Sequence, residues 1–116
     1  MIQISVTQKE KPLIFKLSGR LDALTAGNFE TSVKECLLEK ENCPVFDVEN
    51  LEYISSAGLR VFLLLINEYE SVNKKIGIIS PNEMVTEVFE ISGIKDFVHV
   101  FDSVSEAVSF FSRLDI

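Results

Sequence analysis

Two adjacent serines, Ser55 and Ser56, are the side chains of this sequence most suited to chemistry. They follow an apolar segment with strand character and stand where an apolar run with helical spacing begins. The first backbone N–H groups of a helix lack intrahelical partners, and the helix dipole is positive at that end. A hydroxyl placed there could cap the helix, act as a nucleophile or accept a phosphate. The function depends on which of these three roles applies.

A serine hydrolase is one alternative. Its nucleophile elbow has the pattern G-x-S-x-G at a strand-to-helix turn. Here Ala57 and Gly58 follow Ser56 and complete half of that pattern, but Ile54 stands in place of the leading glycine. The only histidine, His99, falls inside a predicted strand, and a general base must reach the nucleophile. Hydrolysis is therefore only a remote alternative.

A phosphoacceptor aspartate is another alternative, because Asp47 lies near the end of a predicted central strand. Such a site needs clustered acids for Mg²⁺ and a lysine that pairs with the phosphate. The sequence has neither: Asp102, not lysine, follows the strand predicted over 97–101, and no Gly-rich phosphate loop is present. We predict no metal and no cofactor, and expect Asp47 to hydrogen-bond the next loop and help fix the serine turn.

Length and composition indicate one soluble domain, which we assign to residues 1–116. The net charge of −7 without a Lys/Arg cluster argues against nucleic-acid binding. The longest apolar run, 61–66, is too short to cross a bilayer, and the N-terminus lacks a signal-peptide pattern. Cys36 and Cys43 are interpreted as reduced thiols. We therefore expect a cytoplasmic protein without a membrane or nucleic-acid partner.

The elements that would position the serines follow from hydrophobic periodicity and from turn residues. Their order is ββαβαβαβα, and this alternation predicts an α/β domain with one mixed sheet and four helices. The expected elements are strands over 2–6 and 13–17, a helix over 25–40, a strand over 44–48 with a loop over 49–55, a helix over 56–73, a strand over 75–79, a helix from 80 to about 92, a strand over 97–101 and a helix from 103.

Capping residues and core positions complete these expectations. Thr25, Ser80 and Ser103 are the predicted N-caps, the last two as capping boxes, with Pro81 opening its helix and Gly93 ending it. The helix over 56–73 is expected to bury Leu59, Phe62, Leu63, Ile66 and Tyr69, and the predicted core also includes Phe89, Phe97, Phe101, Phe110 and Phe111.

The string YISSAGLRVFLL, preceded by VFDVENLE, resembles the signature of STAS domains and is most similar to the small stand-alone anti-sigma factor antagonists. Members carry a D-S-S-G-L or D-S-A-G-L element at this turn. The segment SGRLDALTAGNFE upstream and the segments KIGIIS, VFEISGI and FVHVF downstream also match the family. The resemblance covers nearly the whole chain and implies the STAS fold.

The resemblance also implies a phosphorylation site. In the family, the serine after the D position accepts phosphate from a partner kinase that is also the anti-sigma factor. The matching acceptor is Ser56, and Ser55 stands where many members have aspartate. Asp22 matches an acid on a loop close to the acceptor, and Asp47 matches the polar residue after the central strand.

The neighbours of Ser56 are expected to serve the partner. We expect Ala57 and Gly58 to leave the first helical turn bare, so that a kinase can approach the hydroxyl. Leu59 and Arg60 are candidates for direct partner contact. A phosphoryl group would add about −1.5 to −2 charges, which the helix N-terminus tolerates. We therefore expect the fold to survive phosphorylation and the switch to act at the partner surface.

The function implied by the resemblance is that of a phosphorylation-controlled switch, not an enzyme. It would bind an anti-sigma factor serine kinase and free the sigma factor, and a serine phosphatase would reset it. ATP and Mg²⁺ would belong to the kinase, and the free protein is expected to be a monomer. A STAS protein of another serine phosphorelay or scaffold, without a sigma factor, is the first alternative.

Overall fold

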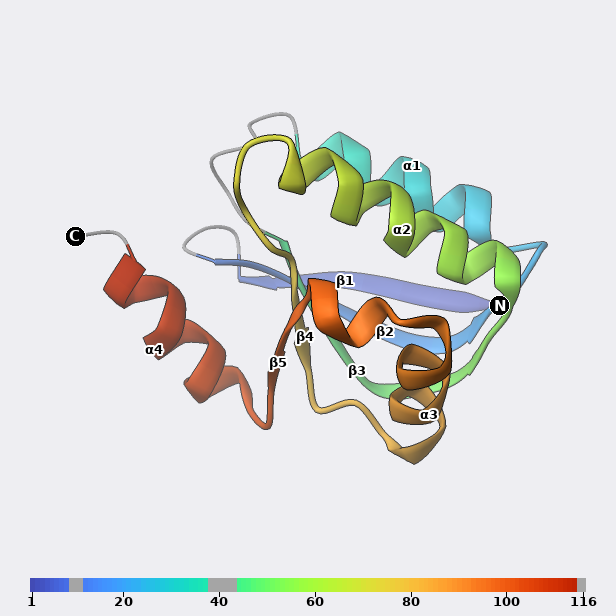
Figure 1. Cartoon of the computed structure of the whole chain (residues 1–116). Helices are drawn as coiled ribbons and strands as arrows, with labels where there is room; N and C mark the ends of the chain where they lie inside the picture. The colour runs from blue at the N-terminus through green and yellow to red at the C-terminus, as the bar shows by residue number, and fades with distance from the viewer. Residues whose placement is uncertain (9–11, 38–43, 115–116) are drawn as a thin grey trace.

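The computed structural model describes residues 1–8, 12–37 and 44–114, which form a five-stranded sheet with helices on both faces (Figure 1). The strands lie side by side in chain order: β1 (Ile2–Gln8), β2 (Leu13–Leu21), β3 (Pro44–Ile54), β4 (Gly77–Ile79) and β5 (His99–Phe101). β1 pairs antiparallel with β2, and all later pairs are parallel. The predicted mixed sheet is confirmed.

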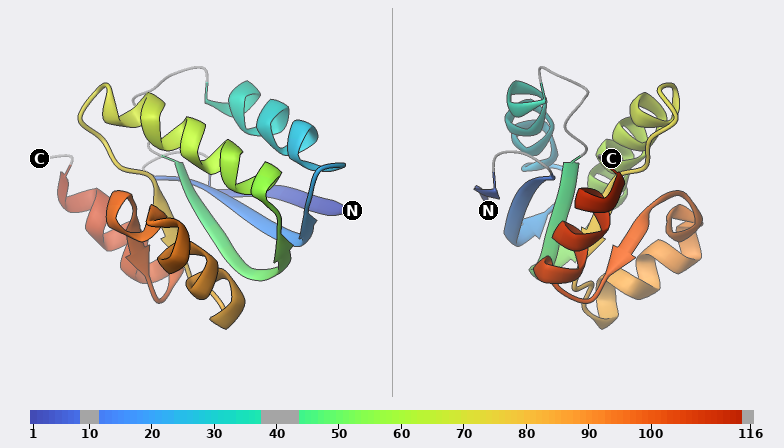
Figure 2. Two further views of the ribbon diagram at one scale, coloured as in Figure 1. Left: turned by 45° about the vertical axis from the view of Figure 1, so that its right-hand side comes forward. Right: turned by 90° about the vertical axis from the view of Figure 1, so that its left-hand side faces the viewer.

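The helices are α1 (Ala26–Cys36), α2 (Ser56–Glu70), α3 (Glu83–Ser92) and α4 (Val104–Leu114), with a 3₁₀ turn, η1 (Ile94–Phe97), between α3 and β5. The predicted order ββαβαβαβα is therefore confirmed, with η1 as an addition. In Figure 2, α1 and α2 lie next to each other over one face of the sheet, and α4 lies on the other side. No helix in the described ranges is long and apolar enough to cross a membrane.

The main core lies between the sheet and helices α1, α2 and α3. Phe46 on β3 is its centre: its ring contacts Phe15, Phe29 and Phe62 at centroid distances of 5.4, 5.8 and 5.3 Å. Neighbouring strand residues point to opposite faces, so Ile14 and Val45 face the other way. There they form a smaller core, completed by Ile79, Phe101, Ala107 and Phe111.

The predicted end of β3 and the predicted start of α3 are wrong. β3 continues through Ile54, so most of the predicted loop 49–55 is strand, because β2 keeps pairing with it as far as Leu21 opposite Ile54. α3 begins after Asn82, whose side chain caps it. Ser80, the predicted cap, has a φ of 51° and donates its hydroxyl hydrogen to the Asp102 carbonyl.

One end of α1 and one end of α2 also differ from prediction, whereas Gly93 ends α3 and Ser103 caps α4 as predicted. Thr25 occupies the N-cap position of α1, but its side chain makes no capping bond. The predicted continuation of α1 to residue 40 lies outside the described residues, as does Cys43, while Cys36 is an exposed free thiol. α2 ends at Glu70 rather than at residue 73, where Asn73 has a φ of 60°.

Part of the predicted core is wrong. Leu63 is exposed, and Val61 and Leu65 are buried in its place. Phe97 lies in η1 rather than in a strand and is also exposed. The remaining predicted residues of α2 are buried, except Leu59, which is half-buried against the main core. Phe89, Phe101 and Phe111 are buried, and Phe110 packs half-buried against the smaller core.

Candidate functional site

The two adjacent serines have different surroundings at the start of α2. Ser55 has an extended backbone and is the N-cap: its Oγ accepts a hydrogen bond from the Gly58 N–H at 3.3 Å. Ser56 is the first helical residue and is exposed. In the part of the chain that the structure describes, no hydrogen bond engages the Ser56 hydroxyl. Ser55 therefore caps the helix, and Ser56 presents a hydroxyl that the fold does not use.

Gly58 is buried against the end of β2, which corrects the expectation that it leaves the helix surface bare. A Cβ on Gly58 would lie 2.7 Å from Leu21 Cγ and 3.0 Å from the Leu21 carbonyl oxygen. The same carbonyl accepts a hydrogen bond from the Ser55 N–H at 2.8 Å. Glycine is required here because α2 approaches β2 closely. Ala57 is half-buried and packs against the main core.

The loop between β2 and α1 is held by a network of hydrogen bonds around Asp22. Its Oδ1 accepts from the Leu24 N–H at 3.0 Å and from the Thr25 N–H at 3.2 Å. The Thr25 hydroxyl accepts from the Asp22 N–H at 2.9 Å and donates to the Arg20 carbonyl at 2.8 Å. Thr25 thus closes the loop instead of capping α1 with its side chain.

Charged groups add to this network. Partial desolvation raises the pKa of Asp22, but the hydrogen bonds from Leu24 and Thr25 outweigh it, so the pKa lies below its usual 3.8. The Arg20 guanidinium lies 3.9 Å from the Asp22 carboxylate and 4.4 Å above the centre of the Tyr53 ring. Asp22 is therefore ionised at neutral pH and fixes the loop beside the serine turn.

Asp47 does not belong to this group. It lies in the first half of β3, and its Oδ1 accepts from the Glu49 N–H at 3.2 Å. β3 continues to Ile54, and a strand rises about 3.3 Å per residue, so the Asp47 carboxylate is far from Ser55. The prediction that Asp47 fixes the serine turn is wrong, because the loop expected after it is a continuous strand.

His99 also lies far from Ser56. It pairs with Gly77, which pairs in turn with Val45, so it is level with the beginning of β3, whereas Ser56 follows the end of β3. Its ring packs against Phe110 with centroids 4.6 Å apart. Burial, with a smaller contribution from Lys75, lowers the pKa of His99. The predicted hydrolase alternative thus lacks a histidine base within reach of the serine.

The two predicted partner contacts on α2 differ in their exposure to solvent. Leu59 is half-buried, whereas Arg60 is exposed. The sequence pattern did not single out Leu24, which lies in the loop ordered by Asp22 and is 91% exposed. Leu24 stands between Ala23 and Thr25, just before a predicted helix, so periodicity did not distinguish it from a core residue.

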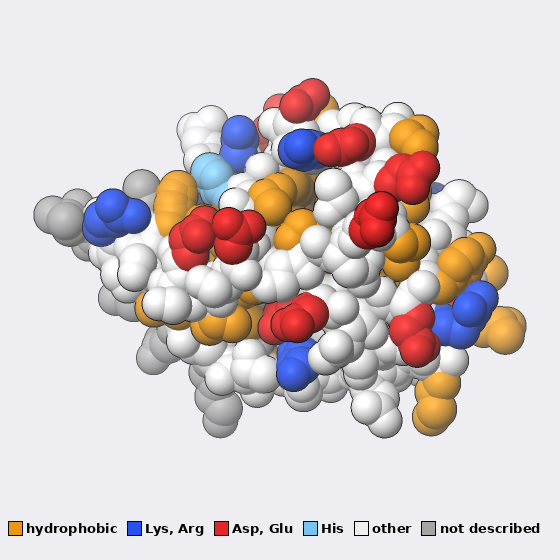
Figure 3. Space-filling view, turned by 90° about the horizontal axis from the view of Figure 1, so that it is seen from below, with side chains coloured by type: hydrophobic (Ala, Val, Ile, Leu, Met, Phe, Trp, Pro, Cys, Tyr) orange, Lys and Arg blue, Asp and Glu red, His pale blue; other side chains and the backbone are white. Residues whose placement is uncertain are grey.

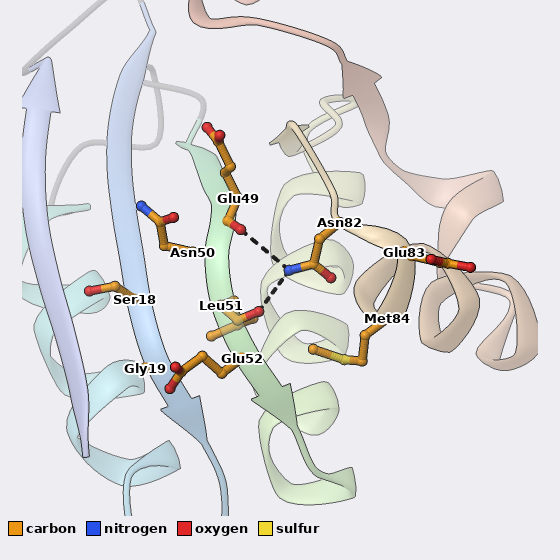
Figure 4. Close-up of a pocket in the computed structure, with 9 residues that line it drawn as sticks. All are labelled: Ser18, Gly19, Glu49, Asn50, Leu51, Glu52, Asn82, Glu83 and Met84. Atoms are coloured by element: carbon orange, nitrogen blue, oxygen red, sulfur yellow. Dashed lines mark hydrogen bonds between the residues drawn. The ribbon is translucent and has the colours of Figure 1, made fainter.

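A shallow depression of about 610 Å³, lined mostly by polar residues, lies along β3 beyond Asp47, where β4 no longer pairs with it (Figure 4). Asn82 crosses it: its Oδ1 accepts from the Val85 N–H at 2.9 Å, and its Nδ2 donates to the Leu51 carbonyl at 2.7 Å. This amide joins α3 to β3. On the face shown in Figure 3, acidic side chains are spread widely, and basic ones form no cluster.

Comparison with known proteins gives consistent matches over nearly the whole chain. A model of the STAS domain family matches residues 3–107. BtrV of Bordetella bronchiseptica, a candidate anti-sigma factor antagonist, is 31% identical over 110 residues, which are 95% of each chain. An anti-sigma-B factor antagonist of Staphylococcus aureus is 26% identical over 99 residues, 85% of this chain and 92% of that protein.

The fold is also similar to that of SpoIIAA, an anti-sigma factor antagonist. Its unphosphorylated form gives a TM-score of 0.74 at 19% identity, covering 99% of this chain and 96% of that one. Its phosphorylated form gives a TM-score of 0.70 at 19% identity, covering 94% and 97%. At this identity the likeness shows a common fold.

Proposed function

This chain belongs to the STAS domain family, and on that premise we propose that it is an anti-sigma factor antagonist controlled by phosphorylation of Ser56. In this proposal the unmodified protein binds an anti-sigma factor that is also a serine kinase, and the sigma factor is released. Phosphate on Ser56 weakens the complex, and a serine phosphatase restores it. The protein itself catalyses no reaction and acts in the cytoplasm, where the kinase uses ATP and Mg²⁺.

The observation that carries this proposal is the free hydroxyl of Ser56. An acceptor must be reachable by a kinase and must not hold the fold together. Ser56 is exposed and makes no bond in the described structure, whereas Ser55 caps α2. The names of the relatives from Bordetella bronchiseptica and Staphylococcus aureus support the assignment of the partner as an anti-sigma factor.

Charge explains how the modification would act. The first N–H groups of α2 and its dipole favour an anion, so a phosphate of about −1.5 to −2 charges is compatible with the fold. The chain already carries a net charge of −7. An apolar partner surface would have to desolvate the new charge, and an acidic partner surface would be repelled by it. Exposed Arg60 and half-buried Leu59, next to the acceptor, are proposed partner contacts.

The first experiment identifies the acceptor. The unmodified protein is used to isolate its serine kinase from native lysate, and the purified kinase is then incubated with ATP and each variant. We expect one phosphate on Ser56, none on Ser56→Ala, and normal modification of Ser55→Ala, which is the matched control. Peptide mapping of the phosphate to Ser55 or Thr25 would contradict the assignment.

The second experiment measures the switch. Calorimetric titration of the kinase should give a higher affinity for the unphosphorylated protein than for the phosphorylated one, with Ser56→Ala close to the unphosphorylated form. Equal affinities of the two forms would rule out the mechanism. A kinase that binds this protein but no sigma factor would assign the chain to another serine phosphorelay.

A further inference from the structure

We propose that Leu24 is the principal apolar contact of this protein with its kinase partner, and that the hydrogen-bonded loop 22–25 presents it for that contact. This inference rests on the proposed function and names part of the surface it requires. Leu24 is 91% exposed, and it lies in an interior loop rather than at a chain end. A partner that covers Leu24 would remove its apolar surface from water, which favours binding.

The loop that carries Leu24 is held by hydrogen bonds, while the Leu24 side chain itself is exposed. The backbone N–H of Leu24 is held by the Asp22 carboxylate at 3.0 Å, and the Ala26 N–H donates to the Asp22 carbonyl at 2.9 Å. The Thr25 hydroxyl donates to the Arg20 carbonyl at 2.8 Å. A loop fixed in this way has little conformational entropy to lose when a partner docks, which favours affinity.

Loop 22–25 and the acceptor serine are parts of one surface. The Ser55 N–H donates to the carbonyl of Leu21, the residue that directly precedes the loop, at 2.8 Å. Gly58 packs against the same Leu21. Figures 1 and 2 show the β2–α1 loop and the beginning of α2 next to each other at one end of the molecule. A kinase that docks on Ser56 and extends over this end of the molecule would also cover Leu24.

This continuity decides what kind of partner fits. The partner surface must bring a phosphate donor to Ser56 and an apolar pocket to Leu24, which describes the kinase rather than an unrelated protein. A phosphate on Ser56 would place charge beside the interface where Leu24 must be desolvated. The same leucine would thus contribute to binding of the unmodified form and lose its contact in the phosphorylated form.

The test compares Leu24→Ala with Val72→Ala by calorimetric titration of the purified kinase. Val72 is also an exposed aliphatic residue, but it follows the other end of α2. We expect Leu24→Ala to bind about tenfold or more weakly, as for an interface anchor, and Val72→Ala to bind within about twofold of the wild type. Both variants should melt close to the wild-type temperature, because neither side chain is buried.

The outcomes separate the two proposals. Normal binding by Leu24→Ala, with a wild type that binds, would overturn the role of Leu24 alone. A wild type that binds no kinase would overturn the proposed function, and this inference with it. A wild type that sediments as a dimer, with Leu24→Ala a monomer of unchanged kinase affinity, would assign the leucine to self-association and overturn the inference.

A double-mutant cycle tests whether the loop positions the leucine. Thr25→Val removes the hydroxyl that closes the loop, and Thr25→Ser retains it. We expect Thr25→Val to weaken binding and to speed amide hydrogen exchange at Leu24, and Thr25→Ser to restore both. In the Leu24→Ala background, Thr25→Val should have no further effect on affinity. Equal losses in both backgrounds would show that Thr25 does not act through Leu24.

Discussion

At the scale of single residues, the important difference in this site is the hydrogen bonding of two neighbouring serines. Ser55 satisfies one of the free N–H groups at the start of α2, so its hydroxyl belongs to the fold. Ser56 carries the same hydroxyl group, but this residue is exposed to solvent and its hydroxyl does not hold the fold. A cap and a proposed acceptor therefore stand side by side, and phosphorylation of Ser56 would leave the Ser55 cap in place.

This difference predicts unequal effects on stability. Ser55→Ala should lower the free energy of unfolding by about 0.5–2 kcal/mol, since it removes the cap. Ser56→Ala should change it by no more than about 0.5 kcal/mol. Urea unfolding of the two variants and the wild type measures both values. A loss for Ser56→Ala as large as that for Ser55→Ala would show that the second serine also supports the fold.

Two helical glycines give a matched comparison. Gly58→Ala should destabilise the protein by about 1–3 kcal/mol, because the new Cβ would overlap Leu21. Gly27→Ala, on α1, meets nothing within 4 Å and should stabilise it by up to about 1 kcal/mol through helix propensity. Thermal melting distinguishes the two signs. A Gly58→Ala protein that melts at the wild-type temperature would restore the expectation of surface clearance.

At the scale of elements, the part of β3 beyond Asp47 has no strand paired to it on the β4 side. β4 has only 3 residues and pairs with β3 no further than Asp47. Beyond Asp47, the Asn82 side chain supplies a hydrogen bond to β3 in place of a strand. It caps α3 and donates to the Leu51 carbonyl. One amide thus satisfies a helix end and a strand edge, and it holds α3 beside the strand that leads to the serine turn.

Loss of the Asn82 side chain should therefore lower the free energy of unfolding more than loss of an ordinary N-cap. Asn82→Ala removes the cap and leaves the Leu51 carbonyl without its donor, at a cost of about 2–3 kcal/mol. Ser103→Ala removes only the cap that holds the Glu106 N–H, at about 1 kcal/mol. Asn82→Ser retains a capping oxygen, so its loss of unfolding free energy should lie between those of Asn82→Ala and Ser103→Ala. Equal unfolding free energies for Asn82→Ser and the wild type would show that the bond to β3 contributes nothing.

At the scale of the whole molecule, the sheet separates two cores of unequal size. The main core holds the cluster of phenylalanines around Phe46, and the smaller one joins α4 to the sheet through Phe101, Ala107 and Phe111. The only histidine of the chain, His99, packs on the smaller core against Phe110. The packing of α4 on this face therefore includes an imidazole whose pKa is lowered by burial.

The pH dependence of stability follows from the His99 shift. Burial, and then Lys75, lower its pKa in the folded protein below the ordinary 6.5, so the unfolded state binds the proton more tightly. The stabilisation is fully present above pH 6.5 and is lost as the pH falls through the folded pKa. The melting temperature of the wild type should thus be lower at pH 5.5 than at pH 7.5, and that of His99→Gln should change less. Parallel changes in both proteins would contradict this.

The sequence by itself determined the order of the elements and the mixed sheet, and it singled out Ser56 as the proposed acceptor. Local signals suffice for these: alternation in β1 and β2, helical spacing after Ser56, and the capping residue Ser103, which the structure confirms. The resemblance of the serine turn to STAS domains depends on contiguous residues, so it needs no tertiary information. Each of these features is decided within a few residues of chain.

Only the tertiary structure decided how the site is built. β3 extends to Ile54 because β2 continues to pair with it, and Gly58 is required because α2 lies against Leu21; both depend on residues distant in the chain. Leu24 and Phe97 are exposed although leucine and phenylalanine usually indicate core, since burial depends on what other elements cover. Pairing, close approach and burial are relations between elements, and hydrophobic periodicity records only one element at a time.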